Sequence, residues 1–188
     1  LLDGPLPDLS NCTGIQYLML SSSSLTGTIP TGFAKLSALN LLYLSSTFLS
    51  GPLPSFSEMT GLVNFYAQET YLSGSIPASF GSLSVLGTMS LAGSRFTGTL
   101  PAAVFNSSFL SYCDLSHNHF SGSIPSLPGP RQDLLYLLAN DNALSGSIPS
   151  SIAELDLLIL NLQLNSLTGP LPVSLQITST LQILNLRG

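Results

Sequence analysis

The stretch LLILNLQLNSLTGPLP, residues 157–172, decides the fold of this chain. Leucines and one asparagine occupy it in the pattern LxxLxLxxNxL. Leu160 and Leu162 flank a polar residue, and this alternation indicates a strand with one buried face. Gly169 then permits a tight turn, and Pro172 restricts the backbone and removes a hydrogen-bond donor. The stretch thus encodes one strand and one turn, too little chain to bury its own apolar face.

The same segment recurs along the whole chain. Its glycine stands at residues 4, 27, 51, 74, 98, 122, 146 and 169, a spacing of 23 or 24 each time. A fixed period in this range is the signature of a solenoid, in which each repeat is buried against its neighbours. We therefore predict that the leucine strands line a concave sheet and that the residues after each proline form a short turn on the convex side.

Apolar residues of these convex turns are predicted to point into the core. They are Phe33, Phe56, Phe80, Val104, Ile152 and Leu175. One coil departs from the pattern, because residues 126–133 read SLPGPRQD. Pro128 and Pro130 exclude a helical turn there and predict an extended loop.

These segments resemble the plant-specific leucine-rich repeat, LxxLxxLxLxxNxLSGxIPxxLxxL. The resemblance covers all 188 residues, with every repeat in register. It implies an α/β solenoid, a right-handed superhelix with a concave parallel β-sheet, short 3-10 or helical turns on the convex side and a second short sheet along the flank. We expect residues 1–188 to be a single segment of about eight repeats without terminal caps, and so a fragment of a longer protein.

The asparagine of the pattern, which the family uses to hydrogen-bond neighbouring coils, defines a ladder position. The later coils carry Asn118, Asn142 and Asn165 there, whereas the earlier coils carry Ser23, Thr47, Thr70 and Ser94. A hydroxyl offers one donor where an amide offers two. We predict that the first four coils hold their turns less tightly than the later ones.

Composition and charge exclude several classes of function. The net charge is −5, and the four basic residues are scattered along the chain, so a nucleic-acid partner is not expected. No apolar run approaches the ~18 residues of a spanning helix, so this segment does not insert into a membrane. Cys12 and Cys113 lie four coils apart, on the order of 19 Å at strand spacing. A disulfide needs about 7 Å, so we predict two buried packing cysteines.

Asp114, His117 and His119 form the group that most resembles a catalytic or metal-binding constellation. A triad needs a histidine held between a nucleophile and an acid, and nothing singles out one of the many repeat serines. Two histidines and one aspartate could bind zinc, but the histidines straddle Asn118 and no further ligand lies nearby. We expect no catalytic residue, no metal and no cofactor, and therefore no enzyme activity.

The outward-facing positions of the concave strands are free of the repeat's constraints. Five of the six tyrosines fall there, Tyr71 borders the same surface, and none of the nine phenylalanines does. Tyrosine supplies apolar area and a hydroxyl at low entropic cost, so this sorting favours a binding face over a plain strand preference. The predicted ligand-binding residues are Tyr17, Tyr43, Tyr66, Gln68, Glu69, Tyr71, Ser90, Arg95, Tyr112, Asp114, His117, Tyr136 and Asn140.

Small side chains occupy the outward positions of the fourth coil, namely Thr88, Ser90, Ala92 and Gly93. We expect a notch there, between a patch of Tyr17, Tyr43 and Tyr66 and a patch of Tyr112 and Tyr136. A peptide or a glycan is predicted to lie across this notch.

Two sequons, Asn11-Cys12-Thr13 and Asn106-Ser107-Ser108, fall on the convex side, and the concave strands carry none. This is the placement expected of an extracellular glycoprotein that works through its concave face. We predict glycosylation at Asn11 and Asn106, and a location at the cell surface or in the cell wall.

Three functions remain open at this point. The resemblance favours the recognition segment of a plant receptor-like kinase or receptor-like protein, with a protein, peptide or glycan ligand and a co-receptor as a further partner. The second is a secreted inhibitor similar to polygalacturonase-inhibiting proteins. The third is a structural spacer that binds nothing.

Overall fold

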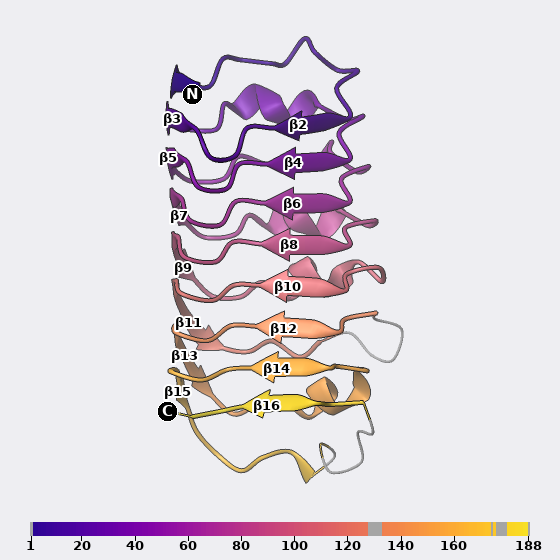
Figure 1. The fold of residues 1–188 in the computed structure, drawn as a ribbon. Helices are drawn as coiled ribbons and strands as arrows, with labels where there is room; N and C mark the ends of the chain where they lie inside the picture. Colours follow the sequence, from indigo (N-terminus) through magenta and orange to yellow (C-terminus); the bar gives the residue numbers. More distant parts are fainter. Residues whose placement is uncertain (1, 128–132, 174, 176–179, 188) are drawn as a thin grey trace.

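The computed structural model describes residues 2–127, 133–173, 175 and 180–187. Two eight-stranded parallel sheets run along the stack of coils, and each coil contributes one strand to each sheet (Figure 1). The predicted solenoid is confirmed.

The concave sheet is formed by the leucine strands, which stack in sequence order. The strands are β2 (Tyr17–Met19), β4 (Leu41–Tyr43), β6 (Asn64–Tyr66), β8 (Thr88–Ser90), β10 (Tyr112–Asp114), β12 (Tyr136–Leu138), β14 (Ile159–Asn161) and β16 (Ile183–Asn185). The central residue is fully buried in β4 and β6, as Leu42 and Phe65, while both of its neighbours in the strand face outward. The repeat period therefore fixes both the strand and its orientation.

The flank sheet, expected from the resemblance, is also present (Figure 1). Its strands are β1 (Asp3–Pro5), β3 (Ser24–Gly27), β5 (Phe48–Gly51), β7 (Tyr71–Gly74), β9 (Arg95–Gly98), β11 (His119–Ser123), β13 (Ala143–Gly146) and β15 (Ser166–Leu167). Gly51 shows why glycine recurs here. Its φ is +78°, and a Cβ at this residue would lie 2.9 Å from Cγ2 of Thr28 in the preceding coil. A larger residue would be strained in both respects.

Among the residues that the structure describes, short 3-10 helices lie on the convex side of four coils. They are η1 (Thr31–Lys35), η2 (Ala78–Ser82), η3 (Ala102–Asn106) and η4 (Ser150–Glu154). Each begins directly after the proline of the repeat, whose fixed φ orients the chain for the turn. Most of the loop predicted at residues 126–133, namely 128–132 with both prolines, lies outside the described residues.

The core is a continuous column of apolar side chains between the two sheets and the convex turns. Phe33, Phe56, Phe80, Val104 and Ile152 are buried in it as predicted, and Leu175 packs partly buried against it. Aromatic contacts join successive coils: the rings of Phe56 and Phe80 lie 5.0 Å apart.

One expectation about burial is wrong, that for Cys12. Two phenylalanines lie outside the core, although not on the concave strands, because Phe48 is 51% and Phe109 58% exposed. Phe48 begins a flank strand and Phe109 lies between η3 and β10, and the leucine pattern places neither side chain inward. Cys113 is buried as predicted, but Cys12 is exposed, because it lies in a surface turn between Leu9 and Ile15. Both thiols are free.

Candidate ligand-binding surface

The outward side chains of the concave sheet form two parallel rows, because the first and third residues of each strand face outward and the strands stack in register. The first row runs through Tyr17, Leu41, Asn64, Thr88, Tyr112, Tyr136, Ile159 and Ile183. The second row runs through Met19, Tyr43, Tyr66, Ser90, Asp114, Leu138, Asn161 and Asn185. Neighbours within a row are 23 or 24 residues apart in the chain.

Four of the predicted tyrosines pair within these rows. The Tyr43 and Tyr66 rings meet edge to face with centroids 4.5 Å apart, and the Tyr112 and Tyr136 rings lie 5.8 Å apart. Tyr17 does not belong to the first pair, because it lies in the other row beside Leu41 and is 62% exposed. The expected patch of three tyrosines is therefore one ring pair and a separate residue.

A hollow separates the two ring pairs, at the place where the notch is predicted. It is lined by Tyr66, Gln68, Thr88, Ser90 and Tyr112. The floor is β8, whose short side chains leave the space open between the two rings. Gln68 is held at the rim, because its Oε1 accepts a hydrogen bond of 2.7 Å from Oγ of Ser45.

Asp114 borders the hollow, because it is the register partner of Ser90. Its Oδ1 accepts hydrogen bonds from the backbone N–H of Ser116 at 3.0 Å and from the Ser116 hydroxyl at 2.6 Å. Its Oδ2 accepts a long bond of 3.3 Å from the Tyr112 hydroxyl. Burial, and after it the negative charge of Asp114, raise the pKa of Tyr112 to about 12. Tyr112 is therefore a neutral donor at physiological pH.

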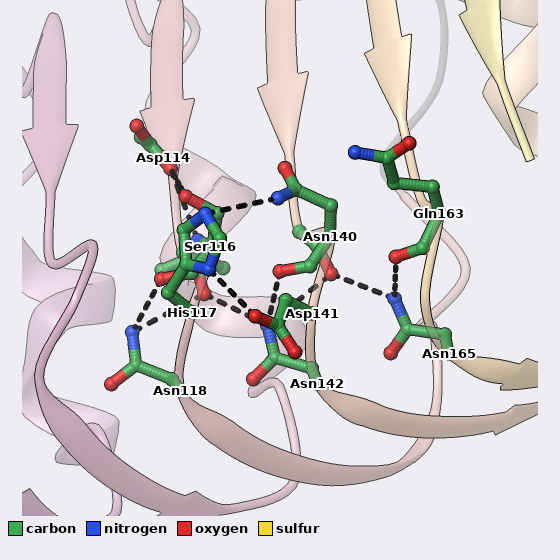
Figure 2. Close-up of polar contacts among 11 residues, drawn as sticks. Asp114, Ser116, His117, Asn118, Asn140, Asp141, Asn142, Gln163 and Asn165 are labelled. Atoms are coloured by element: carbon green, nitrogen blue, oxygen red, sulfur yellow. Dashed lines mark hydrogen bonds and ion pairs between the residues drawn. The ribbon is translucent and has the colours of Figure 1, made fainter. Parts of the chain in front are cut away.

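His117 contacts Asp141 of the next coil and not Asp114, as Figure 2 shows. Its Nδ1 lies 2.7 Å from Oδ2 of Asp141, and its Nε2 lies 3.4 Å from Nδ2 of Asn140. Ser116 donates to Asp114, so the serine, histidine and aspartate do not form a relay. His119 lies apart on the flank strand β11. The described residues contain no cluster of three metal-ligating side chains.

Glu69, Tyr71 and Arg95 lie beyond the hollow, toward the flank sheet. The Arg95 guanidinium carbon is 4.4 Å from the centre of the Tyr71 ring, and Phe48 stacks on Tyr71 at 6.0 Å. Glu69 accepts a hydrogen bond of 2.8 Å from the Ser46 hydroxyl. These three predicted residues therefore lie at the edge of the concave face, separate from the hollow. Phe48 also belongs to this edge, although the sequence analysis did not predict it.

The residue before each ladder position has a left-handed backbone, a feature that sequence reasoning missed. The residues concerned are Ser22, Ser46, Glu69, Gly93, His117, Asp141 and Leu164, with φ between 53° and 62°. A non-glycine residue rarely adopts this conformation, so the stacked coils impose it. In the sequence, Gly93 could have indicated this conformation, because glycine readily adopts a positive φ. The turn directs Glu69, His117 and Asp141 outward at the end of the concave sheet.

The asparagines Asn11 and Asn106 of the two sequons are both exposed. Asn106 is the last residue of η3 on the convex side. Both are accessible to modification.

A family model described as Leucine Rich Repeat matches residues 14–36 and 109–130. A comparison with curated proteins finds no match. Among solved structures, the chain is similar to the plant peptide hormone receptor RGFR1 in complex with RGF2. The identity is 34%, the TM-score is 0.92, and the match covers 99% of this chain and 30% of the receptor.

Two further structures show the range of proteins with this fold. The Arabidopsis receptor kinase HAESA, in complex with the peptide hormone IDA and the co-receptor SERK1, is 32% identical with a TM-score of 0.75, over 90% of this chain and 33% of that one. A plant ice-binding protein is 29% identical with a TM-score of 0.65, over all of this chain and 70% of that one. This chain thus spans about a third of the length of the two receptors. No helix among the described residues is long and apolar enough to cross a membrane.

Proposed function

The chain is a solenoid of plant-type leucine-rich repeats, and we propose that it is the ligand-recognition segment of an extracellular plant receptor that binds a peptide through its concave face. The hollow between the two tyrosine pairs carries this proposal. The similarity to two receptor ectodomains solved with peptide hormones supports it. The parent protein is proposed to lie at the cell surface and to recruit a co-receptor.

The chemistry of the face suits a peptide. Its rows combine aromatic and aliphatic side chains with short polar ones, so a ligand backbone can find both apolar contact and hydrogen bonds there. The rings of each pair pack on one another, so little side-chain entropy is lost when a ligand covers them. Residues with these properties are the ones that dominate the free energy of binding at interfaces.

The proposal can be tested by panning a displayed library of random 12-residue peptides against the immobilised chain. Captured peptides are then measured against the double variant Tyr66→Ala/Tyr112→Ala. We expect binding to weaken by more than ~2 kcal/mol, about 30-fold, as at other aromatic hot spots. Phe109→Ala is the matched control, because it removes an exposed aromatic ring outside both sheets and should leave binding unchanged.

Two results would count against the proposal. A spacer segment would capture no peptide at all. A segment that binds through its flank or convex side would capture peptides whose affinity the double variant leaves intact. Circular dichroism melting of both variants shows whether a loss of binding reflects a loss of fold.

A further inference from the structure

Two tyrosines, Tyr66 and Tyr112, line the hollow. Tyr66 comes from the second row of β6 and Tyr112 from the first row of β10, on opposite sides of the small residues of β8. The face of an aromatic ring carries a partial negative charge and attracts cations within about 6 Å of its centre. A cationic group that stacks on the face of either ring would therefore be favoured over an anionic one.

The Asp114 carboxylate beside the hollow retains acceptor capacity. A carboxylate offers about four lone-pair positions. The two close bonds from Ser116 occupy Oδ1. Among the described residues, Oδ2 accepts one bond, from the Tyr112 hydroxyl at 3.3 Å, which is long for a hydroxyl donor. Oδ2 can therefore accept a shorter, charge-assisted bond from a ligand.

Among the described residues, no lysine or arginine forms an ion pair with this carboxylate. The concave strands β2 to β16 contain no lysine or arginine. Lys35 ends η1 on the convex side, and Arg95 lies over the Tyr71 ring at the flank. The ion pair found among the described residues joins His117 to Asp141, one coil further on. A half-buried carboxylate without a counter-ion is stabilised when a ligand brings one.

We infer that the hollow between Tyr66 and Tyr112 is a pocket for a basic side chain of the peptide ligand, and that Asp114 is its counter-ion. This inference rests on the proposed function and adds the chemical class of the group that is bound. Arginine fits better than lysine, because its planar guanidinium can stack on a tyrosine ring while it donates to a carboxylate oxygen.

The test uses mixtures of N-acetylated hexapeptide amides in which the third position is fixed and the others are randomised. Three mixtures carry arginine, citrulline or glutamate at the fixed position. Citrulline is the decisive comparison, because it has nearly the shape of arginine without the charge. We expect the immobilised chain to retain the arginine mixture at least tenfold more than the citrulline mixture, and the glutamate mixture least.

Two sets of variants test whether the preference for arginine over citrulline peptides arises in the hollow. Asp114→Asn should abolish the preference for arginine, whereas Glu154→Gln, which removes a charge from the exposed convex turn η4, should preserve it. Thr88→Lys should also abolish arginine retention by placing an ammonium in the hollow, and Thr88→Met is its uncharged control. This second pair keeps the test decisive if Asp114→Asn disturbs the Ser116 turn.

The outcomes separate this inference from the proposed function. Equal retention of arginine and citrulline peptides, or a preference that survives both Asp114→Asn and Thr88→Lys, would overturn the basic pocket and leave peptide binding intact. Failure to retain any mixture would overturn both.

Discussion

The first and second halves of the solenoid have the same coil geometry but different links between coils. In the fifth coil, the Asn118 Oδ1 accepts from the backbone N–H of Phe96, and its Nδ2 lies 2.8 Å from the Leu91 carbonyl oxygen. Both partners belong to the preceding coil. Asn142 and Asn165 repeat this arrangement. Figure 2 shows the side chains of Asn118, Asn142 and Asn165 at the ends of successive concave strands. The amide thus joins each coil to its neighbour.

The hydroxyl residues of the first half bond differently. Ser23 and Thr47 each donate to the carbonyl oxygen three residues earlier, at 2.7 Å, within their own coil. Thr70 and Ser94 form an intermediate case, because their hydroxyls lie 3.0 Å apart and bridge the third and fourth coils. A residue at the ladder position can therefore close the turn of its own coil without a side-chain link to the neighbouring coil. Stability should therefore be distributed unevenly along the stack.

The largest expected effect comes from removing one linking amide. Asn118→Leu keeps the number and branching of the side-chain heavy atoms but leaves the Phe96 N–H and the Leu91 carbonyl without their buried partner. Each orphaned group costs about 1–3 kcal/mol, so we expect the free energy of unfolding to fall by about 3 kcal/mol or more. Urea titration followed by circular dichroism measures this loss. A loss below about 1 kcal/mol would show that the amide is not a structural link.

Hydrogen exchange tests the two halves without mutation. The backbone amides of Phe96, Phe120 and Leu144 donate to ladder asparagines. We expect them to exchange about tenfold more slowly than Leu25 and Leu49, which hold the equivalent places in the hydroxyl half. Exchange can be read residue by residue by NMR. Equal protection in both halves would show that the asparagines do not link the coils more tightly than the hydroxyl residues do.

A smaller effect is expected in the hydroxyl half. Thr47→Val preserves the shape of the side chain and removes one hydroxyl, which donates to the Leu44 carbonyl oxygen. The loss of one neutral hydrogen bond should cost about 1 kcal/mol in the same urea titration. The two variants are compared by how much each lowers the free energy of unfolding. If Thr47→Val destabilised the chain as much as Asn118→Leu does, the hydroxyl would also act as a link between coils.

The fold followed from the sequence because the repeat assigns each residue a place within its coil. Leucine spacing gave the concave strands, glycine and proline gave the flank turn, and the small residues Thr88 and Ser90 located the hollow. Contacts between coils were harder to foresee. In a solenoid, the nearest neighbour of a side chain is the residue one period away, so His117 meets Asp141 and not Asp114.

The same reason explains the other departures. Tyr17 and Tyr43 were grouped because they lie on successive strands, but they occupy the first and third strand positions and so fall in different rows. Phe48 stacks on Tyr71, one period along the chain, outside the leucine pattern altogether. Left-handed residues such as Glu69 carry no sequence signal of their own, since only the stacking of coils imposes their conformation.

The smallest expected effect tests whether the second half is stabilised by its amides or by its ion pair. His117 and Asp141 lie 2.7 Å apart, but their side chains are 57% and 54% exposed. Exposed pairs contribute little, because water competes for both partners, so we expect His117→Ala to cost less than about 0.5 kcal/mol. His117→Gly is the matched variant, because glycine relaxes the left-handed φ of 54° and should be at least as stable as the alanine variant. If His117→Ala lowered the free energy of unfolding by several kcal/mol, this surface contact, and not the asparagine ladder, would explain the difference in stability between the halves.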